Sequence, residues 1–226
     1  MICPLPLALS LAALSPGHET PVAPALAEHL PALQETVDRG GQPQALLPYT
    51  YVEAGYGTLS GYSVDSVEAD VDLLSVAGSL ELTPSVHVFL GGATATSIDA
   101  SDPAITDTDV STWFAGVGLN EDLTPNLSGF ARLAVAGSSV EATAAGSPYK
   151  QSDSSLVYSL GARYFAFDSL ELSLIALSAA ESGAKINLEA SALYRVQPDL
   201  GVGLVATMPG RDEDGDSLGL GIRWYF

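Results

Sequence analysis

The chain has 226 residues, of which 47% are hydrophobic and only 15% are charged, so it is too apolar to be a disordered acidic polymer. Eight Lys and Arg residues oppose 27 Asp and Glu residues, and the formal net charge of -19 makes nucleic acid and anionic lipid patches poor partners. The single cysteine, Cys3, lies in the first apolar stretch, so the chain can form no internal disulfide bond and no thiolate metal site.

The first 48 residues differ in pattern from the rest. Residues 2–14 are apolar apart from Ser10, which matches the length of a signal peptide and is too short for a membrane-spanning helix. Small residues at 23–27 favour cleavage there, so we expect residues 1–25 to be a signal peptide. Residues 26–48 contain prolines and paired glycines, and we expect a flexible N-terminal arm.

From Tyr49 to Phe226, apolar residues alternate with small, polar or charged ones. A period of two predicts β-strands throughout this region. The pattern divides into about ten strands, with eight as the alternative. The predicted strands cover residues 49–59, 69–82, 85–97, 110–123, 126–137, 154–167, 170–180, 185–196, 199–208 and 217–226.

Two kinds of connection alternate along the predicted strands. Tight turns with Pro, Asp or Ser lie at 82–85, 123–126, 167–170 and 196–200. Mostly longer and more acidic loops follow at 60–68, 98–109, 138–153, 181–184 and 209–216. This alternation predicts an up-and-down antiparallel arrangement with all turns at one end, all loops at the other, and both ends of the β-region at the turn end.

The charges indicate which face of the strands meets solvent. In the last strand, Leu218, Leu220 and Ile222 share one face, while Arg223 lies between glycines and Tyr225 on the other. A soluble protein would expose such arginines beside many lysines, but the chain has only two lysines. An apolar face toward lipid explains the pattern, and an open sheet edge in lipid would cost several kcal/mol per unpaired group. The sequence therefore predicts an all-β, closed antiparallel transmembrane β-barrel over residues 49–226.

The same alternation predicts a set of charged side chains inside the barrel. These residues are Glu53, Glu81, His87, Arg132, Arg163, Glu171, Glu189, Arg195 and Arg223. We interpret them as a structural ion-pair network that fills much of the lumen. The alternative is a narrow path for ions or small solutes, because inward glycines such as Gly161 and Gly221 leave space.

Aromatic residues fall near the predicted strand ends, on or beside the lipid face. Amphipathic rings sit well at the level of lipid headgroups, so we expect them to line the membrane interfaces. They are Tyr51, Tyr56, Trp113, Tyr158, Tyr164, Tyr194, Trp224 and Phe226.

Motifs for metal binding and catalysis are weak. The acidic run 212–216 is no EF-hand, because the sixth and twelfth positions counted from Asp212 are Ser217 and Arg223. Histidine occurs at 18, 29 and 87 only, so the acidic loops have no histidine for a catalytic site. We expect no enzyme activity, no cofactor and no metal; a hydrolase that uses carboxylates alone is the distant alternative.

The C-terminal strand 217–226 resembles the closing strand of bacterial outer-membrane barrels, including its final aromatic residue. The opening 49–56, the paired Leu-Thr-Pro turns and Gly161-Ala162-Arg163-Tyr164-Phe165 also resemble the small outer-membrane β-barrel proteins, often called porin-like or OmpA-like barrel domains. The resemblance implies a Gram-negative outer membrane, with the final aromatic read by the barrel-assembly machinery. Ten strands also match the omptin proteases, but their acid/histidine site has no counterpart here.

We therefore expect an exported outer-membrane β-barrel protein with a periplasmic arm and a structural or surface-interaction role. A narrow porin-like channel is the alternative. The expected partners are outer-membrane lipid and lipopolysaccharide, and the assembly machinery during biogenesis. Weak binding of divalent cations is a hypothesis for three acidic stretches, which contain Asp65, Glu68, Asp70 and Asp72, then Asp99, Asp102, Asp107 and Asp109, and finally the run 212–216.

Overall fold

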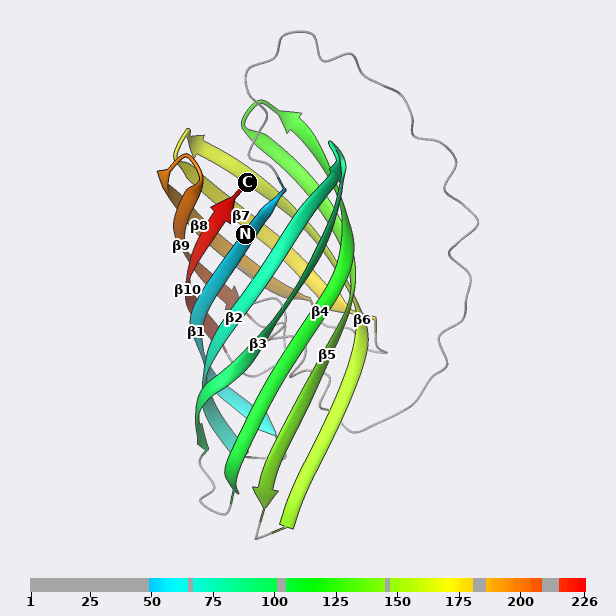
Figure 1. The fold of residues 1–226 in the computed structure, drawn as a ribbon, viewed down its shortest axis with the longest axis vertical. Coiled ribbons are helices and arrows are strands. Elements are labelled where there is room, and N and C mark those ends of the chain that lie inside the picture. Colours follow the sequence, from blue (N-terminus) through cyan, green and yellow to red (C-terminus); the bar gives the residue numbers. More distant parts are fainter. Residues whose placement is uncertain (1–48, 65–66, 101–104, 145–146, 181–185, 209–215) are drawn as a thin grey trace, which may run out of the picture.

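A computed structural model describes residues 49–64, 67–100, 105–144, 147–180, 186–208 and 216–226. This part of the chain forms a closed antiparallel barrel in which each strand pairs with its sequence neighbours and β1 pairs with β10 (Figure 1). The ten strands are β1 Tyr51–Val64, β2 Val67–Thr83, β3 Val86–Ala100, β4 Ile105–Thr124, β5 Leu127–Ala144, β6 Ser147–Phe167, β7 Leu170–Ala179, β8 Asn187–Gln197, β9 Leu200–Met208 and β10 Asp216–Tyr225. The predicted closed barrel is confirmed, and the eight-strand alternative is wrong.

The predicted signal peptide, 1–25, and arm, 26–48, lie outside the described residues. Within the described ranges, no helix is long and apolar enough to cross a membrane.

The tight turns lie at the end of the barrel where the sequence predicted them. Thr83 and Thr124 each precede a proline, and their hydroxyl oxygens accept hydrogen bonds from the backbone N–H groups of Ser85 and Asn126, at 3.4 and 3.3 Å. A threonine that accepts from two residues ahead fixes a turn locally, and the proline between them restricts φ. The two Leu-Thr-Pro turns are thus built by the same short-range contacts.

The strands run farther at the loop end than the sequence predicted. The predicted loop 138–153 is largely strand, since β5 continues to Ala144 and β6 begins at Ser147. The ladder there pairs Ser139 with Ser152 and Glu141 with Lys150. Because these four residues are polar and point outward, the segment lacks the apolar outward face that marks the other strands in the sequence.

This extension makes one wall of the barrel taller than the other. β4, β5 and β6 have 20, 18 and 21 residues, whereas β7 to β10 have 9 to 11. β7 pairs with β6 only from Val157 onward, so residues 147–156 of β6 run beyond β7. Figure 1 shows β4 to β6 reaching farthest at the end opposite the C-terminus. We call the part of β2 to β6 beyond β7 to β10 the projecting wall.

The outer surface is apolar over the height of the short strands. Leu200, Val202, Leu204, Ala206 and Met208 alternate on β9 with residues that point inward. Leu204, in the middle of β9, is 51% exposed although it is leucine. A continuous exposed apolar surface around a barrel is what a lipid environment requires, in agreement with the inverted pattern of the sequence.

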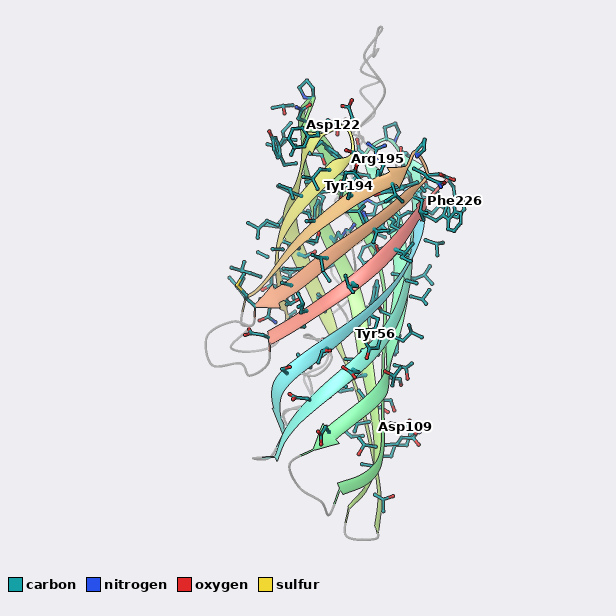
Figure 2. All side chains as sticks on the ribbon, turned by 90° about the vertical axis from the view of Figure 1, so that its left-hand side faces the viewer. Tyr56, Asp109, Asp122, Tyr194, Arg195 and Phe226 are labelled. Atoms are coloured by element: carbon teal, nitrogen blue, oxygen red, sulfur yellow. The ribbon has the colours of Figure 1, made fainter. Side chains whose placement is uncertain are left out.

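Exposed rings form two bands on this outer surface. Figure 2 shows Tyr194 and Phe226 near the turn end and Tyr56 farther toward the loop end. The residues of the turn-end band are Tyr164, Tyr194, Trp224 and Phe226, and those of the loop-end band are Tyr56, Trp113 and Tyr158. Beyond the second band, outward residues become polar, as with Ser111 and Asp109 after Trp113 on β4.

Inside the barrel, phenylalanine rings lie over glycines of the neighbouring strand. Phe130 on β5 is directly opposite Gly161 on β6, and a Cβ atom at Gly161 would overlap that ring. Phe89 likewise covers Gly116, where a Cβ atom would lie 2.7 Å from the ring. The expectation that inward Gly161 leaves open space is therefore wrong, since the glycine makes room for an aromatic ring from the adjacent strand.

Replacing Leu204 with Arg tests the orientation of the outer surface. A charge at mid-depth on a lipid face costs about 2–4 kcal/mol. We expect L204R to lower the free energy of unfolding by this amount in lipid vesicles, measured by denaturant titration. Ser139→Arg on the projecting wall is the control, with little expected change. Equal stability of L204R and wild type would contradict a lipid-facing β9 surface.

A double-mutant cycle tests the glycine and aromatic pairing. We expect Gly161→Ala to destabilise the barrel by about 1–3 kcal/mol, because the added methyl group displaces the Phe130 ring. In a Phe130→Ala background the same substitution has a smaller cost, although Leu174 O, 2.9 Å from the added carbon, keeps it above zero. Additive effects in vesicle unfolding would show that the ring is not the cause.

Candidate functional site

Four charged residues meet inside the turn half of the barrel. Arg163 on β6 donates from Nε and Nη2 to the two carboxylate oxygens of Glu171 on β7, at 2.9 and 3.0 Å. Arg223 on β10 donates from Nε and Nη2 to Glu53 Oε2 on β1, at 3.0 and 2.8 Å. Arg223 Nη1 also lies 3.5 Å from Glu171 Oε1, which joins the two pairs. We call these four residues the lumen ion-pair cluster.

The register of the strands explains how these partners meet. Glu53 and Arg223 are direct partners across the β1–β10 ladder that closes the barrel. Arg163 and Glu171 belong to the β6–β7 hairpin, where Glu171 pairs with Phe165, two residues beyond Arg163. Both alternate with outward residues, so each long side chain points into the lumen.

Tyrosine rings cover the two guanidinium groups. The Arg163 guanidinium carbon lies 4.5 Å from the centre of the Tyr49 ring, and that of Arg223 lies 4.4 Å from the centre of the Tyr51 ring. Arg223 Nη1 also donates to the Tyr225 hydroxyl at 3.3 Å. Cation–π contacts gain strength where water is excluded, so the rings both seal and stabilise the cluster.

A second polar group lies beside the cluster. Arg132 Nε donates to His87 Nε2 at 3.2 Å, and His87 Nδ1 lies 3.2 Å from Asn120 Oδ1. An imidazole that accepts at Nε2 and donates from Nδ1 is the neutral tautomer. The Arg132 guanidinium also lies 5.0 and 4.8 Å from the ring centres of Phe89 and Phe130. Arg132 is therefore held by one neutral acceptor and two aromatic faces.

The structure places the nine predicted lumen residues in three settings. Six of them lie in the two groups described above: Glu53, His87, Arg132, Arg163, Glu171 and Arg223. Glu189 is also fully buried on the inner face, but neither of its carboxylate oxygens has a hydrogen-bond partner.

Glu81 and Arg195 occupy the third setting, at the turn end, where they are only partly buried. Glu81 Oε2 accepts a hydrogen bond from the Tyr49 backbone N–H at 3.3 Å, and Arg195 Nη2 donates to the Asp168 carbonyl oxygen. Both are in phase with buried inward residues of their strands, Ser79 and Leu193, but they lie at the mouth of the barrel. Glu81 and Arg195 lie next to tight turns, where the strands end and fewer side chains from other strands surround them.

The aromatic prediction needs one correction. Tyr51 lies inside the barrel with 5% of its surface exposed, so it is no membrane-interface residue. Its position two residues before Glu53 puts it in the inward phase of β1, so the alternation was sufficient to find it. The other seven predicted aromatics lie on the outer surface.

Two inward residues were missed by sequence reasoning. Asn120 belongs to the inward phase of β4, which the alternation could have identified. Tyr49 lies in the predicted strand 49–59 with the same phase as Tyr51 and Glu53, so the alternation could have identified it too, although β1 begins only at Tyr51. The Tyr49 ring stacks on His87 with centres 4.5 Å apart, a contact that depends on the whole barrel.

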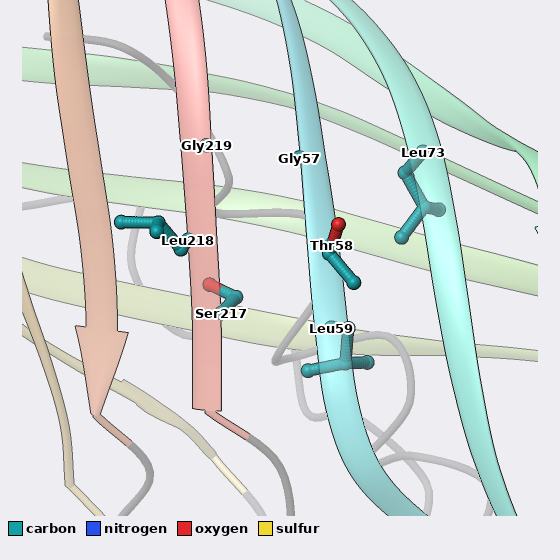
Figure 3. A pocket seen from close by; sticks show the side chains of 7 residues that line it. All are labelled: Gly57, Thr58, Leu59, Leu73, Ser217, Leu218 and Gly219. Atoms are coloured by element: carbon teal, nitrogen blue, oxygen red, sulfur yellow. The ribbon is translucent and has the colours of Figure 1, made fainter.

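Clusters of metal-ligating side chains and cavities are two features that could bind a ligand. Within them, no group of three or more His, Cys, Asp or Glu residues could hold a metal ion. A cavity of about 20 Å³ lies at the β1–β10 seam (Figure 3). This is room for about one water molecule. Its lining residues are Gly57, Thr58, Leu59, Leu73, Ser217, Leu218 and Gly219.

The three acidic stretches fall partly outside the described residues, which exclude 65–66, 101–104 and 209–215. Of the rest, Asp70, Asp99 and Asp109 are exposed, and Asp72 accepts a hydrogen bond from Thr58 Oγ1 at 2.8 Å.

No protein-family model matches the sequence, and no curated protein matches it either. Among solved structures, the KdgM porin is 6% identical with a TM-score of 0.45, and the match covers 78% of this chain and 99% of KdgM. Neisserial surface protein A is 12% identical with a TM-score of 0.43, covering 79% of this chain and 98% of that protein. The outer-membrane protease OmpT from Escherichia coli is 12% identical with a TM-score of 0.44, covering 78% and 94%.

These neighbours are small bacterial outer-membrane barrels, the class that the C-terminal strand resembles. They include a porin, a surface protein and a protease by name, so the similarity does not choose among those functions.

Removing one carboxylate at a time tests the lumen ion-pair cluster. Loss of one partner of a buried pair costs about 3–5 kcal/mol because the other charge stays buried. We expect Glu171→Gln to destabilise the barrel more than Glu53→Gln, since Glu171 faces both Arg163 and Arg223. Unfolding in lipid vesicles measures this ranking.

The matched control is Glu141→Gln, which breaks the exposed pair with Lys150 on the projecting wall. An exposed pair contributes less than about 1 kcal/mol. If E171Q and E141Q had equal effects, the buried cluster would have no special part in stability.

Proposed function

We propose that the chain is an integral outer-membrane β-barrel protein of a Gram-negative bacterium, with a closed lumen and a structural or surface-interaction role. The observation that carries the proposal is the burial of the charged lumen residues. Arg223 is 0%, Arg163 2% and Glu171 3% exposed. Side chains that line a water-filled path contact water, and these do not.

The barrel cross-section is filled by two kinds of contact that support this reading. Near the turns, Tyr49 and Tyr51 cover the guanidinium groups of Arg163 and Arg223. Farther along, Phe89, Phe114 and Leu177 pack with alanines in one buried apolar cluster. Opening a path for solutes would require breaking both layers, so the narrow channel is the weaker candidate.

The expected orientation puts the projecting wall outside the cell. Outer-membrane barrels have short periplasmic turns and longer extracellular loops, so the tight turns would lie in the periplasm. At about 3.3 Å per residue, the ten-residue excess of β6 over β7 corresponds to roughly 30 Å along the tilted strand. A polar wall of this size is the surface that we propose for contacts with lipopolysaccharide or other surface partners.

The ionised groups of this wall support weak contacts with cations. Asp70, Asp99 and Asp109 are exposed at or near its edge, and the pair Lys150–Glu141 lies on its outer face. Divalent cations that bridge such carboxylates to lipopolysaccharide phosphates remain part of the proposal. The barrel-assembly machinery is the proposed partner during insertion.

A non-enzymatic role is supported by the surroundings of His87. It is the one histidine in the described part of the chain, and it is fully buried between Tyr49, Asn120 and Arg132. It therefore has no access to a substrate at the loop end. A hydrolase would have to use loop carboxylates alone.

Planar-bilayer conductance tests the closed lumen. We expect the refolded protein, checked by heat-modifiable gel migration, to insert without steady conductance. The double variant Arg163→Ala/Glu171→Ala removes a neutral pair from the turn half of the lumen, and we expect it to stay silent because the apolar layer of Phe89, Phe114 and Leu177 remains.

Steady, ion-selective conductance of the wild-type protein would overturn the closed lumen and favour the channel. Steady conductance of the folded double variant would show that the apolar layer does not close the lumen by itself. Thermal unfolding of both proteins in the same lipid shows whether the variant is folded during the recording.

A further inference from the structure

Glu189 differs from the other buried acids in the described part of the barrel. It lies on β8, its side chain is 0% exposed, and neither carboxylate oxygen has a hydrogen-bond partner. Glu53 and Glu171, by contrast, each accept hydrogen bonds from a guanidinium group. A buried carboxylate without a compensating contact is costly, so this site requires a physical explanation.

The immediate neighbours of Glu189 are set by strand pairing. On one side it is opposite Ile175 of β7, which is fully buried and offers only hydrocarbon. On the other side it is opposite Thr207 of β9, which is 4% exposed and whose hydroxyl oxygen also has no hydrogen-bond partner. Two carboxylate oxygens and one hydroxyl oxygen, each without a partner, thus belong to adjacent inward positions.

Arg132 is close enough to attract the Glu189 carboxylate electrostatically, but it donates no hydrogen bond to it. Its Nε–H group donates to His87, and its guanidinium lies near two phenyl rings, with no hydrogen bond to either Glu189 oxygen. The guanidinium groups of Arg163 and Arg223 are in contact with Glu171 and Glu53. Neither the cluster nor the Arg132 group therefore donates a hydrogen bond to the oxygen atoms of Glu189.

We propose that Glu189 and Thr207 form a binding site for a monovalent cation in the loop half of the lumen. The unpartnered atoms are oxygens, which attract a hard cation and repel an anion. A calcium site takes six to eight oxygen ligands, usually with several carboxylates, and this site has only one carboxylate. Water molecules complete the shell of the bound ion.

The position of the site suits entry from the loop end. Glu189 is the third residue of β8 and Thr207 is the last but one of β9, and both strands meet the loop end there. The lumen ion-pair cluster lies toward the turns. A cation can therefore occupy this site while the turn half of the lumen stays closed, so the site does not depend on whether the barrel conducts.

The first test compares salts. The refolded full chain in lipid vesicles is unfolded by heat in sodium, potassium or rubidium chloride and in N-methylglucamine chloride at equal ionic strength. A ligand that binds only the folded state raises the midpoint, by about 3–6 °C at ten times its Kd for a protein of this size. We expect this rise with one or more of the small cations and not with N-methylglucamine, which is too large for the site.

Variants assign the effect to these residues. We expect Glu189→Gln to abolish the difference between salts and Thr207→Val to reduce it. The matched control is Glu141→Gln, which removes an acid from the projecting wall and leaves the difference intact. Crystals grown in rubidium chloride should show an anomalous-scattering peak beside the Glu189 carboxylate, a readout that needs no variant.

Three results would overturn the proposal. Equal midpoints in all salts together with no rubidium peak would show that no cation binds. A salt difference that persists in E189Q would place the cation elsewhere. An E189Q protein that is more stable than wild type by the same amount in every salt would show that the carboxyl group carries a proton instead of a metal ion.

Discussion

The ladder between β1 and β10 is the interaction on which the rest of the barrel depends. It joins the first and last strands over residue pairs from Tyr51 with Tyr225 to Ser60 with Asp216. Without it, both edges would expose unpaired backbone groups, which hydrocarbon cannot hydrate. Closure also defines an inside, because every strand must then send alternate side chains into one shared lumen. The Glu53–Arg223 pair crosses this same seam, so the charge pairing and the backbone closure support each other.

Two kinds of contact offset the cost of burying charged groups in the lumen, namely ion pairs and packing against aromatic rings. Arg163 and Arg223 are neutralised by Glu171 and Glu53, and tyrosine rings cover their faces. Glycines on neighbouring strands make room for phenylalanine rings, so the wall positions without side chains are filled from the adjacent strand. The ion pairs and the glycine–phenylalanine contacts each join residues of different strands at the same level along the barrel axis. Both therefore require the observed strand register.

The two halves of the barrel have different chemistry. The turn half holds the paired charges, while the loop half of the lumen holds the apolar cluster of Leu59, Val71 and Leu73 on one wall and Glu189 on another. Outside, the apolar surface ends at the loop-end aromatic band, and the projecting wall continues with polar outward residues. The paired charges and the polar projecting wall thus lie toward opposite ends of the barrel.

Period-two alternation by itself determined the fold class, the closure and the inward direction of Arg163, Arg223, Glu189 and even Tyr51. These properties are local, because the phase of one strand decides which side chains point inward. The alternation did not reveal the long ends of β5 and β6, since outward strand residues beyond the hydrocarbon need not be apolar.

Only the tertiary structure decided which charges meet. Glu53 and Arg223 are 170 residues apart in sequence, and their contact follows from barrel closure. The stagger of all ten strands decides which inward residues lie at the same level along the barrel axis, and no single segment of the sequence encodes that stagger. For this reason the sequence determined that Glu171 and Glu189 both point inward, while the structure alone decided that Glu171 faces two arginines and Glu189 faces a threonine.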